Sequence, residues 1–191
     1  MFLFLTVSVI ISSCKKDKNI DPDQGQMLAT LDNVTSLSLN AKADSFHYIN
    51  SLQGPSFALL RIEGLYGTEG IDYTSLSIEI RAVKIEAKVY DIPKYSANYN
   101  YDYEKGFVLS TFSWLNPRGS KSQRSDRLLS YETYYRENVS GTVTIESILT
   151  NSIKGTYNMT LQGISDKTKT VYVNGSFNTK LVKGSLNVYG N

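Results

Sequence analysis

Hydrophobic and polar residues alternate along this chain in short segments, and glycine, asparagine, aspartate and serine separate one segment from the next. A period of two residues indicates a strand with one buried face, whereas an amphipathic helix repeats every 3.6 residues. No convincing run of helical periodicity is found. The pattern therefore predicts an all-β protein, either an antiparallel β-sandwich or a flattened β-barrel.

The expected strands follow from the same alternation. In the N-terminal half we expect a strand at residues 27–31 with a turn at Asp32-Asn33, then strands around 37–39, at 57–66 and within 76–90. In the C-terminal half we expect strands at 106–115, 141–145, 153–161 and 170–177. Turn residues separate the last three, which predicts consecutive hairpins and hence a C-terminal meander.

The segment 76–90 changes the phase of its alternation halfway. Apolar residues lie at even positions up to Ala82 and at odd positions from Val83 onward. Successive side chains of a regular strand point to opposite faces, so one uninterrupted strand cannot keep both sets on the same face. The sequence predicts a bulge, a corner or a strand break at Ala82-Val83.

The first fourteen residues form an uncharged apolar run that ends in Ile11-Ser12-Ser13-Cys14. Its apolar core of about ten residues is half of the length that a membrane-spanning helix needs, which favours a signal peptide. The ending resembles the lipobox of bacterial lipoproteins, and this resemblance implies lipid attachment at Cys14, the only cysteine. Because Phe2 follows Met1 without the usual Lys or Arg, we expect the natural start to lie upstream.

We expect three parts in the chain: a signal peptide at residues 1–13, a lipidated flexible tether at 14–26 and a single β domain at 27–191. The tether is charged, lacks aromatic residues and contains Pro22 and Gly25, so it buries too little apolar area to fold alone. A Cys-Lys-Lys-Asp start is similar to small lipoproteins of Bacteroidetes-type bacteria. This similarity implies attachment to the bacterial outer membrane, on the cell surface or on the periplasmic face.

A second resemblance lies near the C-terminus, in Gly141-Thr-Val-Thr-Ile145, Ile153-Lys-Gly-Thr-Tyr157 and Val171-Tyr-Val-Asn-Gly-Ser-Phe177. These segments resemble the closing motif G-x-V-x-I, I-x-G-x-F/Y and N-G-x-F of a family of small Bacteroidetes lipoproteins that is catalogued as a domain of unknown function. The match covers residues 139–179 well and 27–110 loosely. It implies location and fold but no activity. We expect the glycines to serve turns and close packing.

Composition narrows the classes of function. The chain has 20 basic and 18 acidic residues, and it has neither an arginine-rich helix nor a nucleic-acid motif, so a nucleic-acid partner is not expected. A single cysteine excludes a disulfide within the chain. The 14 tyrosines and one tryptophan suit half-exposed sheet faces and carbohydrate-facing surfaces alike.

Aromatic residues supply the first candidate surface. Tyr99, Tyr101 and Tyr103 alternate with polar residues, so a strand there would place three phenol rings on one face, with Trp114 nearby. Such a strip could stack on sugar rings and bind a glycan. The alternative is ordinary sheet packing with the hydroxyls at the rim. A second tyrosine cluster follows at 131–135.

A polar segment at residues 116–127 supplies the second candidate surface. It carries four basic residues and one acidic residue, and it contains no apolar anchor. We expect a long exposed loop whose cations could contact an anionic partner such as lipopolysaccharide phosphate; the alternative is a solvated loop without a partner. The four cations are Arg118, Lys121, Arg124 and Arg127.

Catalytic machinery is not expected. His47 is the only histidine, no Gly-x-Ser-x-Gly elbow exists, and no cluster of residues has metal-ligand spacing, so neither a metal nor a cofactor is predicted. Carboxylate pairs for glycoside hydrolysis could be drawn from many acids, which makes that signal weak. These acids are Asp72, Glu79, Glu86, Asp91 and Asp102.

The sequence thus favours a lipid-anchored envelope protein that is not an enzyme and has a binding or interaction role, with weak glycan capture as one form of it. Its partners would be the membrane, through the lipid, and a glycan or another envelope protein. A purely structural lipoprotein is the nearest alternative. A hydrolase of polysaccharide or lipid is the less favoured one, and a cleft with two facing carboxylates would support it.

Overall fold

The computed structural model describes residues 22–50, 56–67, 73–94, 101–115, 128–134 and 136–189, and its regular secondary structure consists of ten strands. The all-β prediction is therefore confirmed. Within this described part, no helix has the length and the hydrophobicity that are needed to span a membrane. The strands are β1 (Gln26–Leu31), β2 (Thr35–Asn50), β3 (Phe57–Tyr66), β4 (Thr74–Ala82), β5 (Val89–Asp91), β6 (Phe107–Leu115), β7 (Leu128–Glu132), β8 (Ser140–Ile148), β9 (Ser152–Gly163) and β10 (Thr170–Tyr189).

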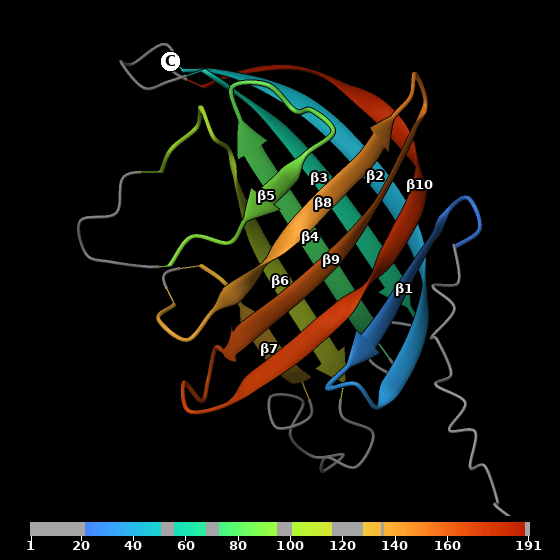
Figure 1. Ribbon diagram of the computed structural model, residues 1–191, viewed down its shortest axis with the longest axis vertical. Helices are drawn as coiled ribbons and strands as arrows, with labels where there is room; N and C mark the ends of the chain where they lie inside the picture. The colour runs from blue at the N-terminus through green and yellow to red at the C-terminus, as the bar shows by residue number, and fades with distance from the viewer. Residues whose placement is uncertain are drawn as a thin grey trace, which may run out of the picture.

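The strands pair around a closed ring, which gives a barrel-like fold. The hydrogen-bonded pairs run β2–β3–β4–β6–β7–β9–β10, and β10 returns to β2. β5 and β8 fill the wall between β6 and β9 beyond the end of β7. In Figure 1, β5, β8 and β9 cross in front of β3, β4 and β6. The antiparallel pairs β8–β9 and β9–β10 form the predicted C-terminal meander.

The expectation of a purely antiparallel sheet needs one correction, because β10 pairs with β2 in parallel and β5 pairs with β6 in parallel. The first of these pairs has a simple cause. β1 lies between β10 and β2 and is antiparallel to both. Two strands that are each antiparallel to a third must run in the same direction. Beyond Gln26, where β1 begins, β10 and β2 meet directly and close the ring.

The predicted interruption at Ala82-Val83 is confirmed. β4 ends at Ala82, which is fully buried, and the chain bends at Val83, whose side chain is exposed. The next strand, β5, begins only at Val89. The intervening segment is held by Tyr90, whose buried ring places its hydroxyl 2.8 Å from the backbone nitrogen of Glu86.

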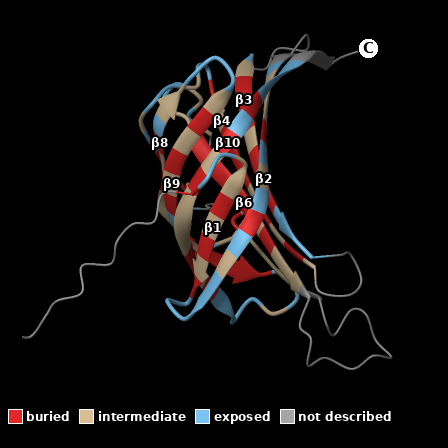
Figure 2. Cartoon of the chain, turned by 90° about the vertical axis from the view of Figure 1, so that its right-hand side faces the viewer, coloured by how far each residue is buried: buried red, intermediate tan, exposed pale blue. Residues whose placement is uncertain are grey.

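Side chains fill the interior of the ring. Along most of the strands that Figure 2 labels, buried residues alternate with half-buried and exposed ones. The buried cluster joins all parts of the wall, and its apolar burial is the main stabilising contribution of the fold. Its largest fully buried members include Tyr90, Phe112, Phe177, Met27, Leu39, Ile62 and Ile78.

The glycines of the C-terminal motif allow strands to approach closely, in keeping with the expectation of close packing. A side chain at Gly175 would begin 1.8 Å from the carbonyl oxygen of Leu28, and one at Gly155 would begin 2.1 Å from the carbonyl oxygen of Thr144. The space above Gly175 is used by Tyr157, whose hydroxyl donates a 2.7 Å hydrogen bond to the carbonyl of Leu28. The motif thereby ties β9 and β10 to β1.

The predicted tether extends less far than expected. Pro22 is buried, and its carbonyl oxygen accepts a hydrogen bond from the side chain of Asn178 on β10. The nitrogen of Gly25 donates to the carbonyl of Asn178, and the carbonyl of Gly25 accepts from Ala41 on β2. Residues 22–26 therefore belong to the domain because backbone hydrogen bonds fix them at the start of β1. Residues 14–21 lie outside the described part of the chain.

Candidate functional site

A buried carboxylate lies on the outer face of the sheet. Ile78 and Ile80 on β4 point into the core, so Glu79 between them points outward, yet only 9% of this residue is exposed. Arg61 lies directly opposite on β3. Its Nε and Nη2 atoms donate hydrogen bonds of 3.0 and 2.8 Å to the same oxygen, Oε1 of Glu79.

Two further groups complete the coordination of Glu79. Arg81, two residues along β4, donates from Nη2 to Oε2 at 3.1 Å, and the hydroxyl of Tyr134 donates to Oε2 at 3.0 Å. Tyr134 arrives from the segment that leaves the sheet after β7. Thr133 fixes the start of that segment through hydrogen bonds between its backbone and side chain and the backbone of Ser110. The four hydrogen bonds satisfy the carboxylate fully.

The electrostatics of this cluster follow from burial and charge. Burial by itself would raise the pKa of Glu79, but the hydrogen bonds and charges of Arg81 and Arg61 outweigh it and hold the pKa below its ordinary value. For Tyr134, burial and then the neighbouring Glu79 charge raise the pKa far above its ordinary value. Near neutral pH, Glu79 is therefore an anion and Tyr134 is a neutral hydrogen-bond donor.

An open depression of about 400 Å³ adjoins this cluster on the outer face of β4 and β6. Leu109, which is itself almost fully buried, contributes apolar surface to it. Ser77 and Thr111 are directly opposite each other on β4 and β6, and Glu132 on β7 continues this row. The lining residues are Ser77, Glu79, Leu109, Ser110, Thr111, Glu132 and Tyr134.

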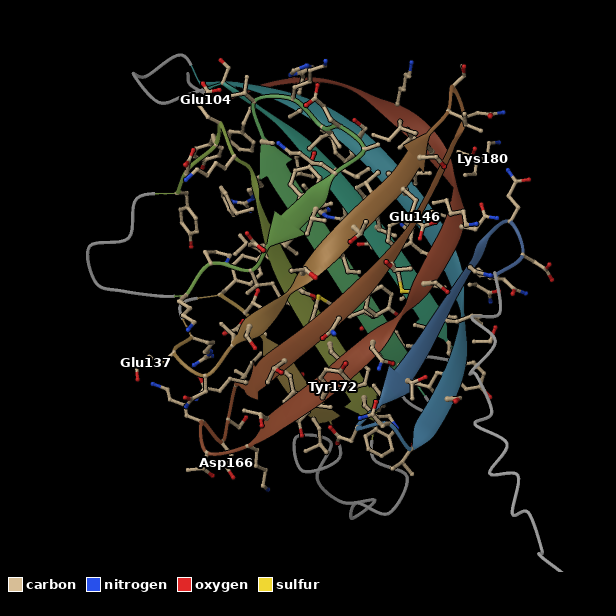
Figure 3. All side chains as sticks on the ribbon, in the orientation of Figure 1. Glu104, Glu137, Glu146, Asp166, Tyr172 and Lys180 are labelled. Carbon is tan, nitrogen blue, oxygen red and sulfur yellow. The ribbon has the colours of Figure 1, made fainter. Side chains whose placement is uncertain are left out.

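The second carboxylate of the depression, Glu132, is also paired. Its oxygen accepts a hydrogen bond from Nη2 of Arg136, a residue of the same segment as Tyr134. That segment continues to Glu137, which lies at the margin of the barrel in Figure 3. The surface that a bound molecule would meet combines hydroxyls, carboxylate oxygens with neutralising partners and an apolar surface. This combination suits a small polyhydroxylated group.

Glu79 does not have the electrostatics of the proton donor in a hydrolytic site. A glycoside hydrolase needs one carboxyl group with a raised pKa to donate a proton to the leaving group. The pKa of Glu79 is lowered, and its two oxygens already accept four hydrogen bonds. Glu79 is therefore a poor proton donor near neutral pH.

The predicted aromatic strip has a different geometry from the one that the alternation suggests. Residues 101–106 form a loop and not a strand, because the backbone nitrogen of Gly106 bonds the carbonyl of Asp102 and that of Lys105 bonds the Asp102 side chain. The ring of Tyr101 stacks on Phe107 at 4.4 Å, and Tyr103 packs edge-on against Phe107 at 5.2 Å. The strand prediction was wrong here because the turn chemistry of Asp102 and Gly106 overrides the alternation.

Trp114 does not join these rings. It shares its face of β6 with the buried Phe112 and packs partly against the core, whereas Phe107 and its two tyrosines lie on the outer face. Trp114 therefore does not form one surface with Tyr101 and Tyr103. Tyr99 lies outside the described residues, as do Cys14, Asp72, Arg118, Lys121, Arg124 and Arg127.

Three of the other acids named from the sequence, Glu86, Asp91 and Asp102, are surface groups. Glu86 pairs with Lys84 at 2.7 Å, Asp102 pairs with Lys105 at 3.7 Å, and Asp91 is exposed. His47 is also exposed. Among the residues that the structure describes, no three His, Cys, Asp or Glu side chains gather closely enough to hold a metal ion.

Sequence reasoning named Glu79 but missed the partners that define the site. Arg61, Arg81 and Glu79 occupy outward positions of their strands, and a charged residue between two core residues was the signal that could have found them. In comparisons with known proteins, no family model, no curated protein and no solved structure matches the chain.

Proposed function

We propose that this chain is a lipid-anchored protein of the bacterial outer membrane, related to small Bacteroidetes-type lipoproteins, that captures glycans without transforming them. The lipid would be attached at Cys14, and the glycan would bind in the depression of β4 and β6. The observation that carries the glycan proposal is the lining of that depression, where the side chains of Ser77, Thr111 and Glu132 form one row beside Tyr134.

The chemistry of this row supports a sugar ligand. A sugar offers several hydroxyls that donate and accept hydrogen bonds, and the row offers both hydroxyls and a carboxylate. Ion pairs already neutralise both carboxylates of the depression, so a neutral ligand faces no unpaired charge there.

The expected affinity is low. The depression is open and shallow, and only a small ligand area is removed from water, so micromolar or weaker binding is expected once the cost of association is subtracted. A lipid anchor would compensate, because many copies on one membrane engage a long polysaccharide together and gain avidity.

A purely structural lipoprotein remains the alternative, in which the depression would bind nothing. A hydrolase is less favoured because Glu79 is held as an anion by two arginines and a tyrosine. We therefore propose binding without catalysis.

Retention on immobilised polysaccharides tests the proposal. The soluble domain should be retarded in native gels that contain a suitable neutral polysaccharide, and Thr111→Val should lose this retardation while its melting temperature stays unchanged. The matched control is Thr144→Val on the outer face of β8, which should keep the wild-type retardation. A wild-type domain that no polysaccharide of a broad panel retards would refute glycan capture.

A further inference from the structure

Among the described residues, paired charged groups border the open depression in two directions. Around Glu79, Arg61 lies on the side of β3, and Arg81 lies toward the C-terminal end of β4. Tyr134 reaches Glu79 from the segment that follows β7. One row further, the side of β3 carries Glu63, which is bound to Lys42 at 2.9 Å. Paired charged groups thus border the depression toward β3 and toward the C-terminal end of β4.

Toward the N-terminal end of β4, the depression adjoins a row of hydroxyl groups. Ser75, Ser113 and Ser130 lie directly opposite one another on β4, β6 and β7. They share the outward parity of the depression residues Ser77, Thr111 and Glu132, so they occupy the next outward row. Each of the three is half-buried, and the hydroxyls of Ser113 and Ser130 lie 3.2 Å apart.

Exposed apolar residues flank this row. Leu65 on β3 lies opposite Ser75 and is 39% exposed. Ile164 is 42% exposed, and its backbone nitrogen donates to the carbonyl of Ser130. The hydroxyl row between Leu65 and Ile164 is thus polar in its middle and apolar at its margins, which matches the alternation of hydroxyls and C–H faces on a sugar chain.

From these contacts, and resting on the proposed glycan capture, we infer that the ligand is an extended, uncharged oligosaccharide that lies along β4 and β6, from Tyr134 in the depression to the row Ser75–Ser113–Ser130. The path from Glu79 to Ser75 spans four residues of a strand, roughly 13 Å, which exceeds the length of a single sugar ring. The oligosaccharide therefore contacts the protein through several consecutive sugar units.

The ion pairs that surround the depression favour a neutral sugar over an acidic one. The groups that reach the depression are carboxylate oxygens and hydroxyls, and two of its lining residues are Glu79 and Glu132. The guanidinium groups of Arg61, Arg81 and Arg136 donate to these carboxylates. A uronate or a phosphate would have to displace these carboxylates to reach a guanidinium group, and the ion pairs that it breaks weaken its binding relative to a neutral sugar.

The test is calorimetric titration of the soluble domain with neutral oligosaccharides of two to six units, derived from glucan, mannan and xylan, and with oligogalacturonates of equal length. For the neutral series that binds, affinity should rise about tenfold from the shortest to the longest member, and the acidic series should bind at least about tenfold more weakly. Ser75→Lys should bind the shortest member like wild type but lose the gain with length. Thr144→Lys, a half-buried outward position on β8, is the matched control and should keep the gain.

Ser130→Lys provides an independent block of the same row if Ser75→Lys does not fold. Affinity that does not depend on length, a gain that survives both lysine variants, or acidic oligosaccharides that bind as tightly as neutral ones would overturn this inference and leave glycan capture standing. Absence of binding by every neutral and acidic oligosaccharide would overturn the proposed function as well.

Discussion

The hydroxyl of Tyr134 lies 3.0 Å from Oε2 of Glu79, although 55 positions separate the two residues in the sequence. This hydrogen bond fastens the segment between β7 and β8 onto the outer face of β4. It also gives the depression a wall on a face that would otherwise be an open sheet. The buried carboxylate of Glu79 therefore has a structural role, and it shapes the depression by holding Arg61, Arg81 and Tyr134 in place.

Replacement of Glu79 by glutamine should lower the free energy of unfolding by about 2 kcal/mol at neutral pH, because Arg61 and Arg81 lose the charge that compensates their partial burial. Urea denaturation measures this difference. The control is Glu63→Gln, whose carboxylate pairs with the exposed Lys42 and should contribute about 0.5 kcal/mol or less. Equal losses in the two variants would contradict a special role for Glu79.

Acidification should remove the stabilisation that the carboxylate of Glu79 contributes. The pKa of Glu79 is lowered on folding from its ordinary value of 4.5, so the unfolded chain binds a proton at a higher pH than the folded one. The stabilisation is fully present above that ordinary value and is lost as the pH falls through the lowered pKa. The stability difference between wild type and Glu79→Gln should therefore be constant near pH 7 and shrink below about pH 4.5. A stability difference between wild type and Glu79→Gln that grows on acidification would contradict a lowered pKa of Glu79 in the folded domain.

Gly175→Ala should be severely destabilising, by about 3 kcal/mol or more, because the added methyl group would overlap the carbonyl of Leu28 and displace the hydroxyl of Tyr157. Thermal unfolding followed by circular dichroism provides the measurement. Ser176→Ala, at the next position of β10, serves as the control and should change the melting temperature little. A Gly175→Ala domain as stable as wild type would mean that β1 and β10 are not packed this closely.

Tyr103→Ala tests the packing of the aromatic loop. Its ring contacts Phe57 at 5.0 Å and Phe107 at 5.2 Å, so its loss should lower stability by about 2 kcal/mol. Retardation by polysaccharide should persist in this variant, because Tyr103 does not line the depression. Tyr66→Ala, at a half-exposed position near the end of β3, is the control and should cost less. Lost retardation at unchanged stability would instead assign glycan binding to Tyr103.

Lipid attachment is tested with the full-length gene that includes any upstream start. Cys14→Ser should abolish labelling by radioactive palmitate and should release the protein from the membrane fraction, because acylation requires the thiol. Wild-type protein is the positive control. Labelling that persists in the serine variant would disprove the lipobox interpretation.

Local alternation predicted much of the fold but little of the site. It located β1 and the meander, in which apolar residues recur at every second position, while Gly67 and Gly106 marked boundaries of β3 and β6. It also located the break after Ala82, where the phase changes. The strand β7 was missed, since Leu128-Leu-Ser-Tyr-Glu132 does not alternate cleanly. The long continuation of β10 past Phe177 was missed as well, because its pairing with β2 depends on where β1 begins.

The site depends on register between strands that are distant in sequence. Arg61 and Glu79 meet because β3 and β4 pair with one particular register, and Tyr134 reaches them only after the chain has passed through β6 and β7. A single sequence carries no direct signal of such a register. At Tyr101 and Tyr103 the alternation was present, but a turn formed by Asp102 and Gly106 was energetically preferred.

The most direct test of glycan capture at the depression is a titration of the ¹⁵N-labelled domain with a neutral oligosaccharide that binds it. The titration records which amide chemical shifts change. We predict fast-exchange shifts that concentrate at Ser77, Glu79, Thr111, Glu132 and Tyr134 and that saturate in the micromolar to millimolar range. The amides of β8 and of the part of β10 around Lys180, which Figure 3 places at the opposite margin of the barrel from Glu137, should not move. Shifts that concentrate outside the depression and the row Ser75–Ser113–Ser130, or a spectrum unchanged by every oligosaccharide, would contradict glycan capture at this site.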